Sequence, residues 1–89
     1  MVWAIKYTKS ANRELSKLDR QIAKRIVDYM DKHIAPLDDP RSVGKILTGS
    51  LGEYWRYRVG DYRVICNIQD NEVLILVVRV GKRSEVYDS

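Results

Sequence analysis

The sequence predicts an α+β domain in two layers, with the element order βααβββ. Residues 11–34 carry apolar side chains at helical spacing, whereas residues 53–80 alternate apolar and polar side chains in three stretches separated by turns. Two helices near the N-terminus are then available to pack on one face of an antiparallel-rich, four-stranded sheet. Residues 1–89 are expected to form a single domain, because a chain this short holds one small core.

The N-terminal half is expected to supply one strand and both helices. Residues 2–7 alternate apolar and polar side chains with β-branched and aromatic members, which predicts the first strand. Ser10 is expected to cap a short helix, and Asp19 a longer one with a continuous apolar stripe. The longer helix should end before Pro36, because the residue ahead of a proline avoids helical geometry.

The C-terminal half is expected to hold three strands, after a loop-like stretch over residues 37–50. Gly60-Asp61 predicts a two-residue hairpin turn, because glycine adopts the positive φ that such turns require. Counting outward from this turn places Arg58 opposite Arg63, and Val59 opposite Tyr62. Asp70-Asn71 marks the second turn, and the strands span about Glu53–Val59, Tyr62–Gln69 and Glu72–Val80.

Two registers remain open for the last strand. A two-residue second turn places Lys82 on the open face of the sheet, away from the helices. A three-residue turn with a bulge places Arg79 and Arg83 there instead. Under either register the last strand ends beside the Arg58/Arg63 pair.

Composition limits the possible partners and compartments. Sixteen Lys and Arg against twelve Asp and Glu give a net charge of +4, which suits a polyanionic or acidic partner. Cys66 is the only cysteine, so no internal disulfide and no cysteine cluster for zinc is possible, and a reducing compartment fits best. No secretory signal is evident, and no apolar run approaches the ~20 residues that span a bilayer. We therefore expect a cytoplasmic protein without membrane contact.

The facing arginines are the main chemical signal. Like charges directly opposite each other on a sheet cost stability, so an anion, most simply phosphate, is expected over Arg58 and Arg63. The alternative interpretation is a solvated sheet face on which arginine stems pack over aromatic rings. His33 is the only histidine and is interpreted as a structural or surface residue. The sequence has no metal-ligand spacing and no glycine-rich phosphate loop, so neither a metal nor a cofactor is expected.

Two motifs carry a family resemblance. The stretch Tyr54-x-Arg-x-Arg-x-Gly-Asp-Tyr-Arg63 and the ending Val80-Gly-Lys-Arg83-x-x-Val-Tyr87, in the order βααβββ, resemble the RelE toxins of the RelE/ParE toxin–antitoxin superfamily. The resemblance covers nearly the whole chain. It implies a metal-independent endoribonuclease that enters the A site of the 70S ribosome and cuts mRNA by attack of the 2′-hydroxyl on the adjacent phosphate, which inhibits translation. It also implies a cognate antitoxin as partner, with operator DNA bound only through the antitoxin complex.

The resemblance also suggests roles for individual residues. It assigns Arg63 to the phosphate, Arg83 to the leaving-group side and Tyr87 to stacking on or orienting the substrate. Arg56 and Arg58 stand where some relatives have lysines, one of them proposed as general base, and a guanidinium is a poor base. Proton removal is left to Lys82, to Tyr87 or to a ribosomal group, or the toxin works mainly by positioning. The candidate catalytic residues are Arg58, Arg63, Lys82, Arg83 and Tyr87, and the candidate RNA-binding residues are Lys45, Tyr54, Arg56 and Arg79.

Two alternative functions stay open. The first is a ParE-like toxin that poisons DNA gyrase without nuclease activity, and the second is a nonenzymatic RNA-binding module. The constellation of Arg63, Arg83 and Tyr87 favours the nuclease, because a gyrase poison does not need it. The C-terminal helix of many RelE relatives is expected to be missing or very short, which would leave an open groove for an antitoxin segment.

Overall fold

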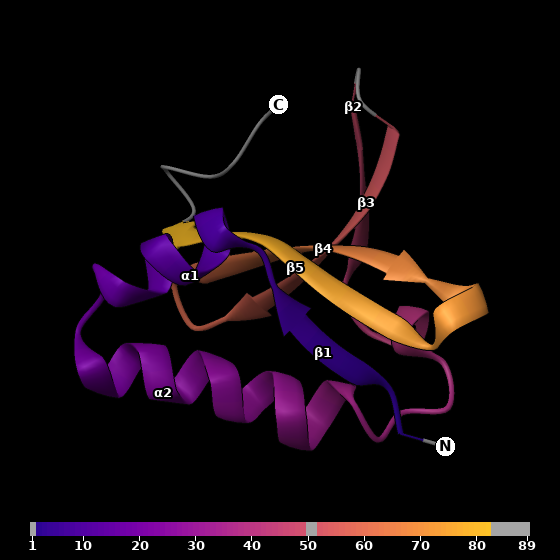
Figure 1. Ribbon diagram of the computed structural model, residues 1–89, viewed down its shortest axis with the longest axis horizontal. Helices are drawn as coiled ribbons and strands as arrows, with labels where there is room; N and C mark the ends of the chain where they lie inside the picture. The colour runs from indigo at the N-terminus through magenta and orange to yellow at the C-terminus, as the bar shows by residue number, and fades with distance from the viewer. Residues whose placement is uncertain (1, 50–51, 83–89) are drawn as a thin grey trace.

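A computed structural model describes residues 2–49 and 52–82, and its elements confirm a two-layer α+β fold (Figure 1). The N-terminal half forms β1 (Ala4–Tyr7), α1 (Lys9–Ser16) and α2 (Arg20–Tyr29). The C-terminal half forms β2 (Lys45–Gly49), β3 (Gly52–Val59), β4 (Tyr62–Gln69) and β5 (Leu74–Lys82). The β2–β3 hairpin extends away from both helices (Figure 1). Within the described residues no helix is long and apolar enough to cross a membrane.

The sheet has five strands, in the order β1-β5-β4-β3-β2. β1 runs parallel to β5, and every other neighbouring pair is antiparallel. The expected number of four strands is therefore wrong, because residues 45–49, interpreted as loop, pair with β3 as the additional strand. β2 is short and lies at the edge of the sheet, where Ile46 remains 49% exposed, so it lacks the alternating burial that predicts a strand.

Thr8, not Ser10, caps α1. The Thr8 hydroxyl accepts a hydrogen bond from the backbone N–H of Ala11 at 3.1 Å, and Ser10 lies inside the helix. The Thr8 backbone N–H also donates to the carbonyl oxygen of Val77 at 3.0 Å. The cap therefore fixes the start of α1 against β5, directly after β1 ends.

Asp19 caps α2 as predicted, because its carboxylate accepts a hydrogen bond from the backbone N–H of Gln21 at 2.8 Å. Beyond α2 the chain continues as a π-helical turn over Met30–Ile34, which ends before Pro36 as predicted, although Ala35 ahead of the proline keeps helical angles of φ −55° and ψ −39°. Met30 and Ile34 are fully buried, so the apolar stripe continues through this turn. The core fills the space between helices and sheet and includes Ala11, Leu15, Ile26, Tyr57, Val64, Cys66, Ile75 and Val77.

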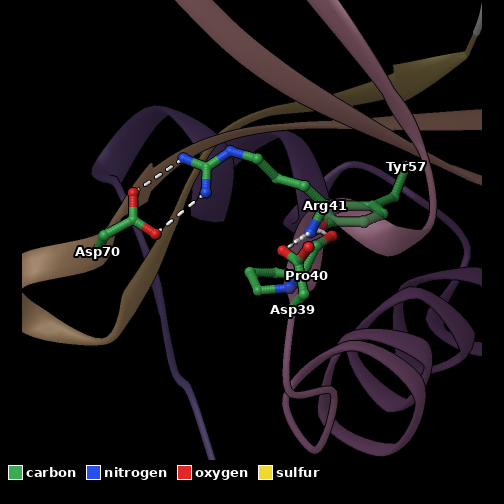
Figure 2. A network of polar contacts seen from close by, with 5 residues as sticks. All are labelled: Asp39, Pro40, Arg41, Tyr57 and Asp70. Carbon is green, nitrogen blue, oxygen red and sulfur yellow. Dashed lines mark hydrogen bonds and ion pairs between the residues drawn. The ribbon is translucent and has the colours of Figure 1, made fainter.

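A strap, residues 37–44, extends the helical layer over β3. The buried Tyr57 hydroxyl donates to the carbonyl oxygen of Pro40 at 2.6 Å (Figure 2). Arg41 binds both carboxylate oxygens of Asp70 at 3.0 Å, at the turn between β4 and β5 (Figure 2). The Asp39 carboxylate accepts a hydrogen bond from the Arg41 backbone N–H at 2.9 Å. These contacts fix the strap and so determine where β2 begins.

The β3–β4 register confirms that Arg58 lies opposite Arg63 and Val59 opposite Tyr62. The β4–β5 register follows neither expectation in full. Residues 70–73 form the turn, and a bulge between Ile65 and Cys66 shifts the pairing, so that Arg63 faces Gly81 and Ile65 faces Arg79.

Candidate functional site

Strand register gathers cations on the face of the sheet that the helices do not cover. Val64 and Cys66 of β4 belong to the core, so the residues between and beside them point to the opposite face. Lys45, Arg56 and Ile65 lie side by side across β2, β3 and β4 on this opposite face. The predicted residues Lys45, Tyr54, Arg56, Arg58, Arg63 and Arg79 all occupy register positions of this face.

Arg63 is the centre of this site, which we call the basic face and define as Lys45, Arg56, Arg58 and Arg63. Arg63 is only 9% exposed and is the one charged residue that is buried in the described part of the chain. Its cross-strand partner Arg58 is exposed, and the Arg58 Nε donates to the carbonyl oxygen of Gly60 at 3.2 Å. A solvated sheet face would leave both guanidinium groups in water, so the burial of Arg63 favours a built site.

The basic face borders a cavity of about 210 Å³, which we call the basic cavity. Among the described residues its lining consists of Gly44 and Tyr57 together with the four residues of the basic face, and none of these is a carboxylate. Guanidinium groups offer planar, charged donor pairs that match phosphate oxygens. The cavity is therefore suited to bind an anion, and in particular to stabilise charge on a phosphoryl group.

Tyr57 borders this cavity but does not supply a base. Its pKa is raised above the usual value by burial, and its hydroxyl donates to the Pro40 carbonyl on the strap side. Sequence reasoning missed Tyr57 and Gly44 as lining residues. The register places Tyr57 opposite Val64 on the core side, yet it lines the cavity together with Gly44 at the end of the strap.

Arg79 lies on the same face but is partly neutralised. Its guanidinium forms an ion pair with the Glu14 carboxylate at 3.2 Å, and the other oxygen of Glu14 accepts a hydrogen bond from the backbone N–H of Val80 at 2.8 Å. Glu14 belongs to α1, so this contact holds Arg79 at the outer edge of β5. Arg79 is thus a peripheral member of the predicted RNA-binding set.

Lys82 does not join the basic face. It pairs with Tyr62, whose ring packs against the core from the helix side, and directly paired residues share a face. Lys82 lines a different cavity, of about 560 Å³, together with Glu14 and Leu18. The predicted residues Arg83 and Tyr87 lie outside the described residues. In the described part of the chain, no three His, Cys, Asp or Glu side chains are grouped so as to hold a metal ion.

Comparison with known proteins identifies the family to which the chain belongs. A family profile described as the ParE toxin of the type II toxin–antitoxin system parDE matches residues 5–87. The chain belongs to the RelE/ParE toxin family. It is 31% identical over 80 residues to Toxin RelE of Mycobacterium tuberculosis, covering 90% of this chain and 80% of that protein. It is 29% identical over 87 residues to Toxin RelG of the same organism, covering 98% of each chain.

A solved structure agrees with this RelE/ParE assignment. The chain superposes on a chain of the toxin–antitoxin complex RelBE2 from Mycobacterium tuberculosis with a TM-score of 0.83 and 27% sequence identity. The match covers 96% of this chain and 95% of that one. The protein is thus a toxin of a type II toxin–antitoxin system, and the predicted fold and family are confirmed.

Proposed function

We propose that this RelE/ParE-family toxin is a ribosome-dependent mRNA endonuclease that cuts in the A site and inhibits translation. The observation that carries the proposal is the basic cavity, in which buried Arg63 lies beside Arg56, Arg58 and Lys45, and to which residues 2–49 and 52–82 contribute no carboxylate. Such a site binds phosphate, and it strengthens its hold as the phosphoryl group gains negative charge in the transition state.

The proposed reaction is an internal transfer that needs no metal. The 2′-oxygen forms a bond to the adjacent phosphorus while the bond from phosphorus to the 5′-oxygen of the next nucleotide breaks. A base takes the proton of the 2′-hydroxyl, and the departing 5′-oxygen gains a proton. The products are a 2′,3′-cyclic phosphate and a 5′-hydroxyl. Arg63 and Arg58 would stabilise the charge on the phosphoryl oxygens.

Proton transfer is the step of this reaction that the candidate residues support least. Arginine is a poor base at neutral pH, and Lys82 faces the other side of the sheet from Arg63. The proton acceptor is then Tyr87 or a ribosomal group, or the toxin acts mainly by holding the RNA in line for attack. Each of these makes cutting depend on the geometry that the ribosome imposes on the message.

The first test replaces Arg63. In a purified translation system with primer extension on the mRNA, Arg63→Ala is expected to slow cutting about 10²–10³-fold, as removal of one transition-state donor commonly does. Arg20→Ala, an exposed α2 residue outside the basic face, is the matched control and should cut normally. Full cutting by a folded Arg63→Ala variant would refute the assignment.

The second test concerns the ribosome. Naked mRNA, mRNA on ribosomes with an empty A site, and the same message with a deoxynucleotide at the cut position are compared. Cutting is expected only in the second case, because the attack requires a 2′-hydroxyl and an in-line geometry that free RNA rarely adopts. Efficient cutting of naked or deoxy-substituted RNA would contradict the proposed mechanism.

A ParE-like gyrase poison is the second candidate, and the family profile that matches residues 5–87 favours it by its description. One fold hosts both activities, so fold does not separate them. Inhibition of gyrase supercoiling by wild type and Arg63→Ala alike, without mRNA cutting, would establish this alternative. Binding of RNA without cutting and without gyrase inhibition would indicate a nonenzymatic RNA-binding module.

We further propose that a cognate antitoxin neutralises the toxin in the cytoplasm and that operator DNA is bound only through their complex. Support comes from the similar chain of RelBE2, which was solved as a toxin–antitoxin complex. Co-purification with the protein encoded beside the toxin gene tests the partner. DNA binding by the toxin alone would contradict the indirect route to operator DNA.

A further inference from the structure

A second cationic cavity lies on the helix side of the sheet, between α2 and the turn that joins β3 to β4. It has a volume of about 510 Å³ and we call it the helix groove. Lys24, Arg25 and Lys32 line it from the helical side, and Arg58 and Gly60 line it from the hairpin. The volume is within the range of about 300–1,000 Å³ that is typical of ligand sites. The charges of α2 look like an ordinary solvated helix face in the sequence, so only the fold reveals the groove.

The helix groove carries surplus positive charge. Asp28 is the one carboxylate among the described residues that line it, and it is bound to Lys24 at 2.8 Å. In the described part of the chain no ion pair engages Arg25, Lys32 or Arg58. Unpaired cations that line one concave surface raise the local concentration of anions.

An aromatic pair also lines the helix groove. The rings of Tyr29 and His33 have centroids 5.3 Å apart and an interplanar angle of 37°. Aromatic faces beside cations are the usual platform for the bases of single-stranded nucleic acid. A helical peptide would instead need apolar anchors, and the only aliphatic side chain that the described residues contribute to the lining is Val59, which is 5% exposed. The lining therefore favours RNA over an antitoxin helix.

Arg58 connects the helix groove to the basic cavity, because it lines both. Its Nε donates to the Gly60 carbonyl oxygen at 3.2 Å, which holds the side chain at the hairpin turn. The Arg25 guanidinium packs against Gly60 so closely that a Cβ there would come within 3.2 Å of it. Cations thus continue around the turn from one cavity to the other.

We propose that the helix groove binds the RNA that flanks the segment held on the basic face. Arg25 and Lys32 contact its phosphates, and one base stacks on Tyr29 or His33. A single RNA strand would then run from one cavity to the other around the β3–β4 turn, past Arg58. The proposal rests on the proposed function, since it adds a second contact region for the same substrate.

The test measures the affinity of the full-length toxin for fluorescent single-stranded RNA with a deoxynucleotide at the cut position. A trinucleotide probes the basic face alone, and a longer oligonucleotide probes both regions. Lys32→Glu and Arg25→Gln are each expected to weaken binding of the long RNA about fivefold near 0.1 M salt and to lower its salt slope by about 0.7 per lost phosphate contact. Trinucleotide binding should not change. Lys9→Glu, exposed on α1, is the matched control.

Two outcomes would overturn the inference. One is equal affinity for the short and long RNA together with groove variants that bind like Lys9→Glu. The other is a loss of antitoxin affinity in the groove variants with unchanged RNA binding, which would make the groove a protein-binding surface. Ribosomal cutting by wild type and Arg63→Ala is measured in parallel. If cutting still depends on Arg63, the proposed function stands even where the helix groove fails its test.

Discussion

The Tyr7 hydroxyl is buried and has no hydrogen-bond partner among the described residues. Burial is the main reason that the pKa of Tyr7 is raised from 10.0 to about 12, and the negative charge of Asp31 adds to the shift. An unfolded tyrosine ionises near pH 10, whereas folded Tyr7 stays neutral until about pH 12. Ionisation of Tyr7 therefore has no effect on stability below pH 10, and between the two values it lowers stability by at most about 1.4 kcal/mol per pH unit.

Tyr7→Phe is expected to stabilise the toxin at pH 7 by up to about 1–3 kcal/mol, because it removes a buried hydroxyl that lacks a partner. It should also make the loss of stability above pH 10 shallower. Urea unfolding at neutral and alkaline pH measures both effects.

Tyr57→Phe is the matched comparison for Tyr7→Phe. The Tyr57 hydroxyl donates to the Pro40 carbonyl oxygen, so its removal is expected to destabilise the toxin by about 1–3 kcal/mol. Equal effects of the two replacements would mean that the Tyr7 hydroxyl has a partner.

At the residue scale, the sequence predicts which residues face each other across the strands better than it predicts which side chains are buried. The Gly60-Asp61 turn is local and fixes the count along both strands, so the opposition of Arg58 and Arg63 follows from it directly. The burial of Arg63 depends instead on how the rest of the fold packs around β4, which the turn does not determine. No pattern within β4 carries that information.

At the scale of elements, the junction between the strap and β2 depends on Gly44. Its φ is +82°, and a Cβ there would lie 2.5 Å from the Arg56 carbonyl oxygen and 2.7 Å from Trp55 Nε1. That indole nitrogen donates to the Val43 carbonyl oxygen at 2.6 Å. The junction therefore has no room for a side chain, and it places Lys45 directly beside Arg56.

Gly44→Ala is expected to destabilise the toxin more than Gly60→Ala. Both glycines have positive φ, which costs an alanine about 1–2 kcal/mol at either site. At Gly60 a Cβ would meet only the movable end of Arg25, whereas at Gly44 it would meet backbone and break the Trp55–Val43 hydrogen bond, for about 0.5–1.5 kcal/mol more. Urea unfolding ranks the two variants, and equal costs would show that the close approach at Gly44 is relieved elsewhere.

The features that the sequence failed to predict have no recognisable burial or turn pattern of their own. Lys45 and Ile46 of β2 are exposed, and the strand pairs along its length with β3. The β4–β5 register depends on Val73, which adopts φ 50°, a conformation that β-branched residues rarely take. Sequence rules place a turn at Asp70-Asn71 and so miscount the residues before β5. The helices, whose capping and periodicity are local, are predicted nearly correctly.

At the scale of the whole molecule, the chain has a net charge of +4, and four of its cations are gathered on the basic face. Antitoxin binding is expected to weaken with salt yet to persist at moderate salt, because exposed charge contacts are screened while buried apolar contacts are not. Titration calorimetry at two salt concentrations measures this dependence. Lys45→Glu should reduce affinity at low salt more than at high salt. A complex that dissociates fully at moderate salt would show that charge alone holds it.

The parallel pairing of β1 with β5 governs when a newly made toxin can act. Ala4 pairs with Leu74 and Tyr7 with Val77, so the first strand has no neighbour until almost the whole chain has been synthesised. Pairing between strands so far apart in the chain makes folding slow and late. β4, which carries Arg63, likewise completes its pairing only with β5. The basic face is therefore complete only after most of the chain has been synthesised, and the interval before folding gives an antitoxin time to meet the nascent product.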